Sequence, residues 1–232
     1  MSTEKKITVI SLGGSLIVPK TGFNILFLKS FKQFILKFIE NNHCFIIVCG
    51  GGNTARVYQK AALEVGELTP EDIDWIGIHA TRLNAHFVRT LLREFAHPVV
   101  IKDYSDLKNI QWSEQILIAA GWKPGWSTDY DSVLLAKQFK IKRVINLSNI
   151  SHVYDSDPRV NLNAKQFKNM TWPEFRKLVG NTWDPGANVP FDPVASREAQ
   201  AEKLEVCILD GTNLKEVEKA IQGEKFEGTI IH

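Results

Sequence analysis

The chain of 232 residues is long enough for one large domain or two small ones, and its 44% hydrophobic and 23% charged residues are ordinary for a globular protein. The formal net charge of +2, with scattered Lys and Arg, gives no basis for nucleic-acid binding but allows small anionic ligands. No apolar run approaches a membrane span, and the polar N-terminus lacks a signal core. Cys44, Cys49 and Cys207 have no metal-binding spacing, so we interpret them as buried thiols of a cytoplasmic protein.

Short apolar runs alternate with helical patterns along the chain. The expected strands are 7–12, 44–49, 98–101, 115–119, 143–147, 205–209 and 228–231. Phenylalanines at helical spacing over 27–38 predict one helix, and others are expected over 53–65, from Thr69-Pro70 to about Phe95, and over 132–139. Residues 171–174 and 213–216 have the pattern of capping boxes. The alternation predicts an α/β fold with an open, mostly parallel sheet, helices on both faces, and ligands beyond the carboxyl ends of the strands.

Two of the expected strands run directly into glycines, at Gly13-Gly14 and at Gly50-Gly51-Gly52. Glycine lets backbone amides approach a ligand closely, and the N-terminus of a following helix favours phosphate. The first turn alone is equally compatible with a purely structural turn. In the second, Arg56 follows about one helical turn later, and its planar guanidinium suits phosphate oxygens. The pair predicts a site for two phosphorylated groups that face each other.

Two later segments also carry chemically useful side chains. Residues 120–129 form a Gly- and Pro-containing loop in which capping explains the hydroxyls, whereas two tryptophans and a lysine indicate cover for a ring or a subunit contact. Residues 148–158 follow a strand and combine an aromatic side chain with two acids. These could hold a base and a metal, but an Asp-Pro turn explains them equally well. No nucleophilic triad and no metal-ligand set is predicted.

In this order, the four segments resemble those of the amino acid kinase family, most closely its archaeal-type uridylate (UMP) kinases, over nearly the whole chain. Residues 74–85 are the most specific part and are similar to the Asp-x-Ile-Gly-Ile-x-x-Thr-Arg-x-Asn-Ala stretch of those kinases. Residues 124–129 resemble their Pro-Gly-His-Thr-Thr-Asp, residues 149–158 their nucleotide-binding Thr-Asn-Val-Asp-Gly-Val-Tyr-x-x-Asp-Pro, and residues 191–195 their Asp-Pro-x-Ala. The resemblance implies one domain over 1–232, a three-layer α/β/α sandwich with a UMP half (about 1–130) and an ATP half (about 131–232), assembled as a homo-hexamer.

The resemblance also implies phosphoryl transfer from ATP to UMP, with Mg²⁺, and assigns residues by position. Those expected to contact UMP are Gly51, Asp74, Trp122, Lys123, Pro124, Gly125, Trp126, Ser127 and Thr128. Those expected around ATP are Gly13, Gly14, Gly52 and Arg56 at the phosphates and Ser148, Asn149, Tyr154 and Asp157 at the adenosine. Arg56 and Asp129 are the candidate catalytic residues, and no protein ligand to a metal is predicted.

Two departures from the family pattern bear on function. Ser11 stands where most of the wider family has a lysine, and Arg56 is the first candidate to replace that charge, ahead of Lys123 and Lys165. Ser151-His152 stands where the family has Asp-Gly. Two alternatives therefore remain: a sister kinase acting on another small phosphate or carboxylate, and a non-catalytic nucleotide-binding sensor or storage protein. The sequence also leaves open whether CMP or dUMP is accepted.

Overall fold

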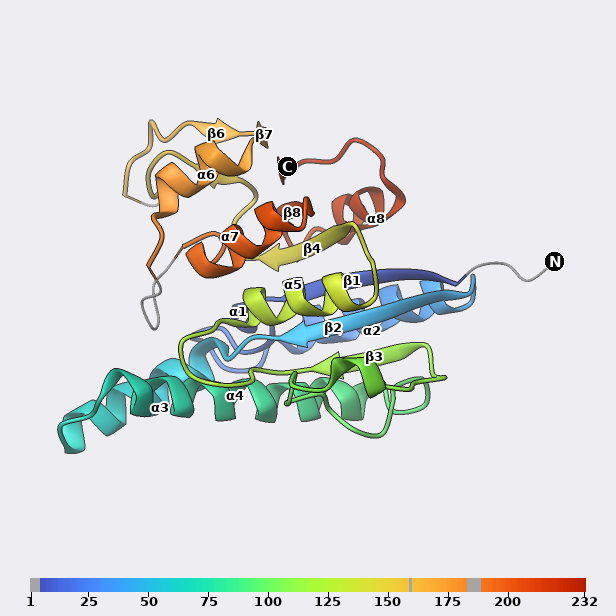
Figure 1. Ribbon diagram of the computed structural model, residues 1–232, viewed down its shortest axis with the longest axis horizontal. Helices are drawn as coiled ribbons and strands as arrows, with labels where there is room; N and C mark the ends of the chain where they lie inside the picture. The colour runs from blue at the N-terminus through green and yellow to red at the C-terminus, as the bar shows by residue number, and fades with distance from the viewer. Residues whose placement is uncertain (1–4, 159, 183–188) are drawn as a thin grey trace.

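Seven strands form one central sheet in the order β3-β2-β1-β4-β8-β9-β7, within residues 5–158, 160–182 and 189–232, which are the residues that this computed structural model describes (Figure 1). The strands are β1 (Lys6–Leu12), β2 (His43–Cys49), β3 (Ile116–Ala119), β4 (Arg143–Ser148), β7 (Asn169–Met170), β8 (Glu205–Asp210) and β9 (Thr229–Ile231). All neighbouring pairs are parallel except β8 and β9. The mostly parallel sheet is thus confirmed. Strands β1, β2, β4 and β8 all end at the same edge.

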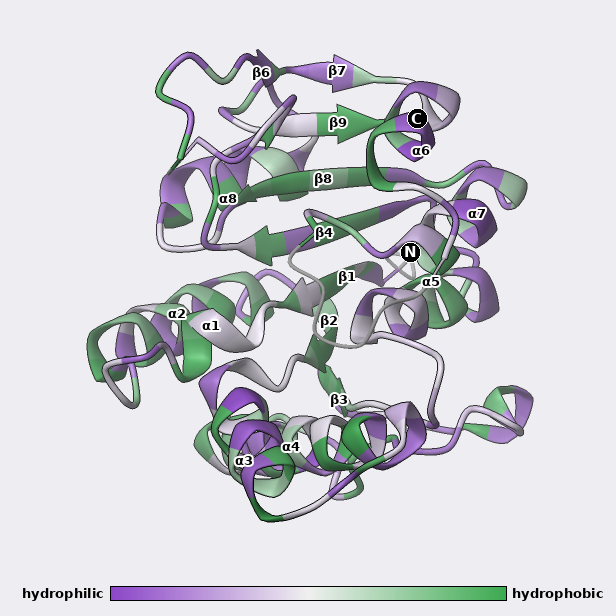
Figure 2. Cartoon of the chain, turned by 90° about the vertical axis from the view of Figure 1, so that its left-hand side faces the viewer, coloured by the Kyte–Doolittle hydropathy of each residue, from purple (hydrophilic) through white to green (hydrophobic). Residues whose placement is uncertain are grey.

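Helices cover both faces of the sheet, which confirms the three-layer α/β/α prediction. One face packs against α1 (Gly14–Ile17), α2 (Ile25–Ile39), α4 (Pro70–Leu91) and α8 (Leu214–Gln222), and the other against α5 (Thr128–Gln138), α6 (Trp172–Val179) and α7 (Pro193–Ala201). Helix α3 (Gly52–Val65) packs on α4 and buries no residue of its own. Figure 2 shows the mostly hydrophobic strands stacked between these helices.

The strands read as continuous apolar runs because both of their faces are buried. Successive side chains of β2 point to opposite faces: Phe45 and Ile47 join the core under α2 and α4, whereas Ile46 and Val48 join the core under α5. The phenylalanines of α2, including Phe31 and Phe38, are buried against the first of these cores, as predicted. Cys44, Cys49 and Cys207 are free and buried, which confirms that they are buried thiols.

The predicted strand at 98–101 is wrong. This segment contacts β3 through isolated bridges, Ala96 with Ile116 and Ile101 with Ala119, and does not form a ladder. Pro98 lies between the two bridges and has no N–H to donate to a neighbouring strand. The sheet therefore ends at β3 on this side.

Helix ends account for the other differences. Helix α4 ends at Leu91, four residues before the expected Phe95, and α5 begins at Thr128, before the expected Ser132, because Ser127 caps it. The box predicted at 213–216 is wrong: Asn213 makes no side-chain cap, and the Glu216 carboxylate accepts from Lys219 Nζ and Glu227 N instead.

The sequence patterns gave no prediction for several short elements. These are α1, α7, η1 (Leu107–Asn109), β7 and the hairpin of β5 (Val153–Tyr154) with β6 (Gln166–Phe167).

Helix α4 starts after Thr69, as predicted, and its start is a capping box. Thr69 Oγ1 accepts from Asp72 N at 3.2 Å, and Thr69 N donates to the Asp72 carboxylate at 2.9 Å. We expect Thr69→Ala to lower the free energy of unfolding by about 1 kcal/mol, since Asp72 N at the start of the helix loses its acceptor. Urea denaturation measures this, with Thr90→Ala as control, because the Thr90 hydroxyl only donates to His86 O within the same helix. Equal losses in the two variants would contradict a capping role.

No helix in the described ranges is both long and apolar enough to cross a lipid bilayer.

Candidate functional site

The largest cavity near the glycine turns opens at the carboxyl ends of the strands and has a volume of about 870 Å³. Its walls come from the start of α3, from α4, and from the loop that leads into α5. In the sheet, β1 lies between β2 and β4, so the chain winds outward in both directions from the β1–β4 pair. Ligands of open parallel sheets bind at such a switch point, which agrees with the predicted location.

The predicted residues that line this cavity are Gly51, Gly52, Arg56, Asp74, Trp126, Ser127, Thr128 and Asn149. They come from both predicted halves of the chain. Gly51 and Gly52 begin α3, and Ser127 and Thr128 begin α5, so two helix N-termini meet at one cavity. The partial positive charge of helix N-termini favours phosphate at this place.

The two glycine turns contact each other directly. A Cβ on Gly14 would lie 2.1 Å from Gly52 N, and a Cβ on Gly52 would lie 2.2 Å from Gly14 O. Gly52 also has a φ of +61°, in the left-handed region that favours glycine. Gly13 and Gly14 do not line the described cavity, whereas their neighbour Ser15 does. The first turn therefore packs behind the second turn, which lines the cavity.

Gly14→Ala tests this contact. The added methyl group meets backbone atoms that cannot move aside, so we expect a loss of about 1–3 kcal/mol in the free energy of unfolding and a strong loss of ligand binding. Gly66→Ala is the control, because a Cβ there has no neighbour within 4 Å. Thermal denaturation of both variants measures the difference; a Gly14→Ala variant as stable as the control would contradict the close contact.

Two cations line the cavity, Arg56 and Lys20. Arg56 is exposed and makes no hydrogen bond or ion pair with any residue in the described part of the chain, so its guanidinium remains available to a ligand. Lys20 was not predicted, because no sequence pattern places its loop at the cavity. Lys165 is not among the described residues that line this cavity.

The loop before α5 divides into two parts. Trp126, Ser127 and Thr128 line the cavity, whereas Trp122, Lys123, Pro124 and Gly125 do not line it within the described structure. Lys123 Nζ lies 4.4 Å from the centroid of the Trp122 ring and 4.2 Å from that of Trp126. This cation–π sandwich makes Lys123 a poor replacement for the missing lysine. Gly125 N donates to the Asp74 carboxylate at 2.7 Å, which ties the loop to α4.

Asp129 lies deeper, at the start of α5. Its Oδ1 accepts from Ser11 Oγ at 3.0 Å and from Asn146 Nδ2 at 2.8 Å, and its Oδ2 accepts from Asp192 N at 3.3 Å. Burial and the neighbouring Asp192 carboxyl raise the pKa of Asp129 to about 7. Ser11, which stands where most of the family has a lysine, is thus a neutral hydrogen-bond partner of Asp129.

A second pocket of about 210 Å³ lies beside the first and is lined by all four residues predicted at the adenosine: Ser148, Asn149, Tyr154 and Asp157. Asn149 lines both pockets, which makes them neighbours. His152 does not line either pocket as described. It is 3% exposed, its Nε2 lies 3.7 Å from the Glu227 carboxylate, and burial lowers its pKa.

No group of three or more His, Cys, Asp and Glu side chains that could hold a metal ion occurs among residues 5–158, 160–182 and 189–232. Asp129 is hydrogen-bonded to Ser11, in the strand that leads into the first glycine turn, and both of its oxygens already accept protein donors. A Mg²⁺ ion at this site would therefore be held mainly by substrate phosphates, as is common for this ion.

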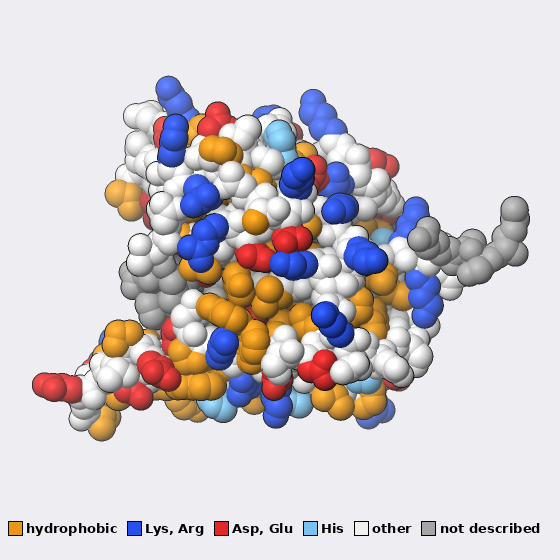
Figure 3. Space-filling view, viewed as in Figure 1, with side chains coloured by type: hydrophobic (Ala, Val, Ile, Leu, Met, Phe, Trp, Pro, Cys, Tyr) orange, Lys and Arg blue, Asp and Glu red, His pale blue; other side chains and the backbone are white. Residues whose placement is uncertain are grey.

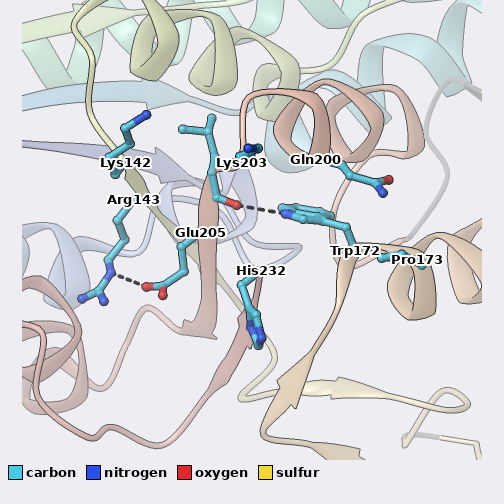
Figure 4. Close-up of a pocket in the computed structure, with 9 residues that line it drawn as sticks. Lys142, Arg143, Trp172, Pro173, Gln200, Lys203, Glu205 and His232 are labelled. Atoms are coloured by element: carbon cyan, nitrogen blue, oxygen red, sulfur yellow. Dashed lines mark hydrogen bonds and ion pairs between the residues drawn. The ribbon is translucent and has the colours of Figure 1, made fainter.

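A further cavity, of about 590 Å³, lies at the opposite edge of the sheet, where β4 and β8 begin (Figure 4). Arg143 pairs with Glu205, and Trp172 Nε1 donates to Leu204 O at 2.9 Å. Lys142 and His232 point in different directions and do not converge on one position. None of the predicted site residues lines this cavity, and its polar groups mainly join α6 and the strands.

Comparisons with known proteins agree with this geometry. The model of the amino acid kinase family matches residues 6–210. The chain is 35% identical over 225 residues to a uridylate kinase of Methanococcus vannielii, covering 96% of this chain and 98% of that one, and 34% identical over 227 residues to a uridylate kinase of Thermococcus onnurineus, with the same coverage.

Solved structures show the same likeness. The crystal structure of a uridylate kinase from Archaeoglobus fulgidus superposes with a TM-score of 0.81 at 30% identity, over 98% of this chain and 100% of that one. A UMP kinase from Bacillus anthracis shares the fold with a TM-score of 0.77 at 20% identity, over 98% of this chain and 96% of that one. Together, the family match and the archaeal relatives show that the chain belongs to the amino acid kinase family.

Proposed function

We propose that this chain transfers the γ-phosphoryl group of ATP to UMP, giving ADP and UDP. The observation that carries the proposal is the pair of neighbouring pockets that share Asn149. One combines two helix N-termini with Arg56 and Asp74, and the other contains the residues expected at an adenosine. The uridylate kinases among its relatives support UMP as the acceptor, and membership of the kinase family supports ATP as the donor.

Phosphoryl transfer needs positioning and charge neutralisation more than covalent help from the protein. In our proposal, the N-termini of α3 and α5 hold the facing phosphates, and Arg56 and Lys20 neutralise charge on the moving group. Asp74 receives a ribose hydroxyl of UMP, and Trp126 covers the pyrimidine. Mg²⁺, when bound with ATP, supplies further positive charge at the phosphates.

A coupled assay of ADP release tests the function, with ATP, Mg²⁺ and, separately, UMP, CMP, dUMP and isopentenyl phosphate as acceptors. We expect turnover with UMP to exceed that with isopentenyl phosphate by at least 100-fold, since a site built for a ribose and a base leaves polar groups unpaired when these are missing. Comparable turnover with isopentenyl phosphate would indicate a sister kinase. ATP binding without turnover on any acceptor would indicate a sensor or storage protein.

We also propose that the protein works as a cytoplasmic homo-oligomer, a hexamer by the family resemblance. Helix α3 exposes Val57, Tyr58, Leu63 and Val65, and hydrophobic side chains lie among acids where α3 reaches the surface, at the lower left of Figure 3. Side chains of this kind commonly lie in contacts between subunits. Light scattering after size exclusion measures the multiple of the 26.2 kDa chain mass. A monomer at micromolar concentration would contradict the proposal.

A further inference from the structure

The cavity of about 870 Å³ is the acceptor pocket of the proposed reaction. Three residues on one turn of α4 hold both of the loops that form it. They are Thr81, Arg82 and Asn84, which belong to the most specific stretch of the sequence, and none of them has a role in the proposed reaction so far. Asn84 is 2% exposed, and its Nδ2 donates to Gly50 O at 2.8 Å and to Gly51 O at 3.0 Å. One buried amide thus binds two carbonyls of the second glycine turn.

The same helical turn binds the backbone of the other loop. Thr81 Oγ1 accepts from Gly121 N at 2.8 Å and donates to Ile78 O at 2.6 Å. Arg82 Nε donates to Gly121 O at 3.2 Å, and its Nη2 donates to Trp122 O at 2.8 Å. The two consecutive side chains therefore fix three backbone groups at the start of the loop that leads to Ser127 and Thr128.

These contacts leave little room for adjustment. A Cβ on Gly121 would lie 2.9 Å from Thr81 Oγ1, and one on Gly51 would lie 3.6 Å from Thr81 Cγ2. Both loops are therefore packed against the helix as well as hydrogen-bonded to it. Because the helix is continuous from Pro70 to Leu91 and contacts both loops, it sets the distance between them.

We infer that Thr81, Arg82 and Asn84 are positioning residues that hold the glycine turn before Arg56 and the loop before Thr128 at the separation required by the acceptor. The inference rests on the proposed function, since it concerns the acceptor pocket of that reaction. Arg82 and Asn84 do not line the described cavity and act through backbone groups, whereas Thr81 lines the cavity and also holds Gly121 N. Displacing a bound group by about 1 Å can reduce the rate of a reaction by about 100-fold, so the geometry of this helical turn bears on catalysis.

The first test compares two arginines of α4. Arg82→Lys keeps the charge but loses the planar fork that reaches two carbonyls. Arg89→Lys is a matched control, because Arg89 Nε also donates to a backbone carbonyl, His97 O at 3.2 Å, and Arg89 does not line the acceptor cavity in the described structure.

We expect Arg82→Lys to lower kcat/KM for UMP by 10- to 100-fold, with the dissociation constant of ATP changed by less than threefold. The control should change neither value. An Arg82→Lys variant that matches the control, or one that loses ATP binding as strongly as UMP turnover, would overturn the inference.

The second test does not depend on activity. Thr81→Val is close to isosteric but leaves Gly121 N without its acceptor, whereas Thr81→Ser keeps the hydroxyl. Hydrogen exchange measured on peptides covering 120–128 should become at least tenfold faster in Thr81→Val, and Thr81→Ser should restore the wild-type rate.

Unchanged exchange in Thr81→Val would overturn the inference even if the wild type phosphorylates UMP. If the wild type does not phosphorylate UMP, the proposed function fails, and this exchange experiment alone decides whether Thr81 holds the loop.

Discussion

Replacing Arg56 with alanine is expected to lower kcat for UMP phosphorylation by about 10²- to 10³-fold, with KM for UMP changed by only a few fold. The reason is that charge on the phosphoryl oxygens develops as the group moves, so a cation beside it acts mainly on the transition state. Arg56 lines the acceptor cavity beside the first turn of α3, and it has no partner in the described residues that would hold it elsewhere. Steady-state kinetics with UMP varied at saturating ATP measures the effect.

Three variants make this prediction specific. Arg56→Lys should recover part of kcat, because it restores the charge without the fork. Lys60→Ala, one turn further along α3, should have no effect, since Lys60 is exposed and pairs with Glu64 at 3.7 Å. Lys20→Ala tests the second cation of the cavity. If Arg56→Ala keeps its kcat and only UMP binding weakens, Arg56 is not the catalytic cation, and a loss in Lys20→Ala would assign that role to Lys20.

Local patterns in the sequence were sufficient to predict most of the fold. Strands β1 (Lys6–Leu12) and β2 (His43–Cys49) are mainly apolar, and each is followed by an amphipathic helix. This pattern is typical of a parallel sheet that is buried on both faces. The errors lie where tertiary contacts override the local pattern. The segment at 98–101 has strand-like residues but only two bridges to β3, and the Glu216 carboxylate binds Lys219 and Glu227 rather than the start of its own helix.

Site residues could be predicted where their place next to a glycine turn or at the start of a helix is visible in the sequence. Arg56, Ser127 and Thr128 follow a glycine turn or begin a helix, and they line the cavity as expected. Contacts between distant segments could not be read from the sequence: Asn84 binding Gly50, and Lys123 held between two tryptophans, both depend on how the chain folds back on itself. Lys20 was missed because no sequence pattern places its loop at the cavity.

The environment of Asp129 makes a second strong prediction. An acid whose pKa rises from 3.8 to about 7 on folding keeps a proton in the folded protein that the unfolded chain releases. The folded state therefore binds more protons between about pH 4 and pH 7, and stability falls as the pH rises through this window. The charged Asp129 thus costs the most stability above pH 7, up to about 4 kcal/mol from the size of the shift.

Asp129→Asn should consequently be more stable than the wild type at pH 8, and the difference should shrink toward pH 4. If Asp129 also organises the site, as we propose from its bonds to Ser11 and Asn146, kcat should fall at least tenfold in the same variant. Stability and activity would then change in opposite directions, as is common where a functional group is buried at a cost. Urea denaturation at pH 5 and pH 8, together with kinetics at pH 8, measures both.

Asp131→Asn separates the two effects. Asp131 is fully buried on the same helix, and burial raises its pKa well above the ordinary value, so its replacement should also stabilise the protein at pH 8. It does not contact Ser11 or Asn146 through any hydrogen bond within the described ranges, and turnover should therefore be retained. Loss of turnover in Asp129→Asn alone would place the catalytic requirement at the position where Ser11 replaces the family lysine. Equal turnover in both variants would make Asp129 a structural acid. Among the described residues, the charge that acts on the moving phosphoryl group would then come from Arg56 and Lys20.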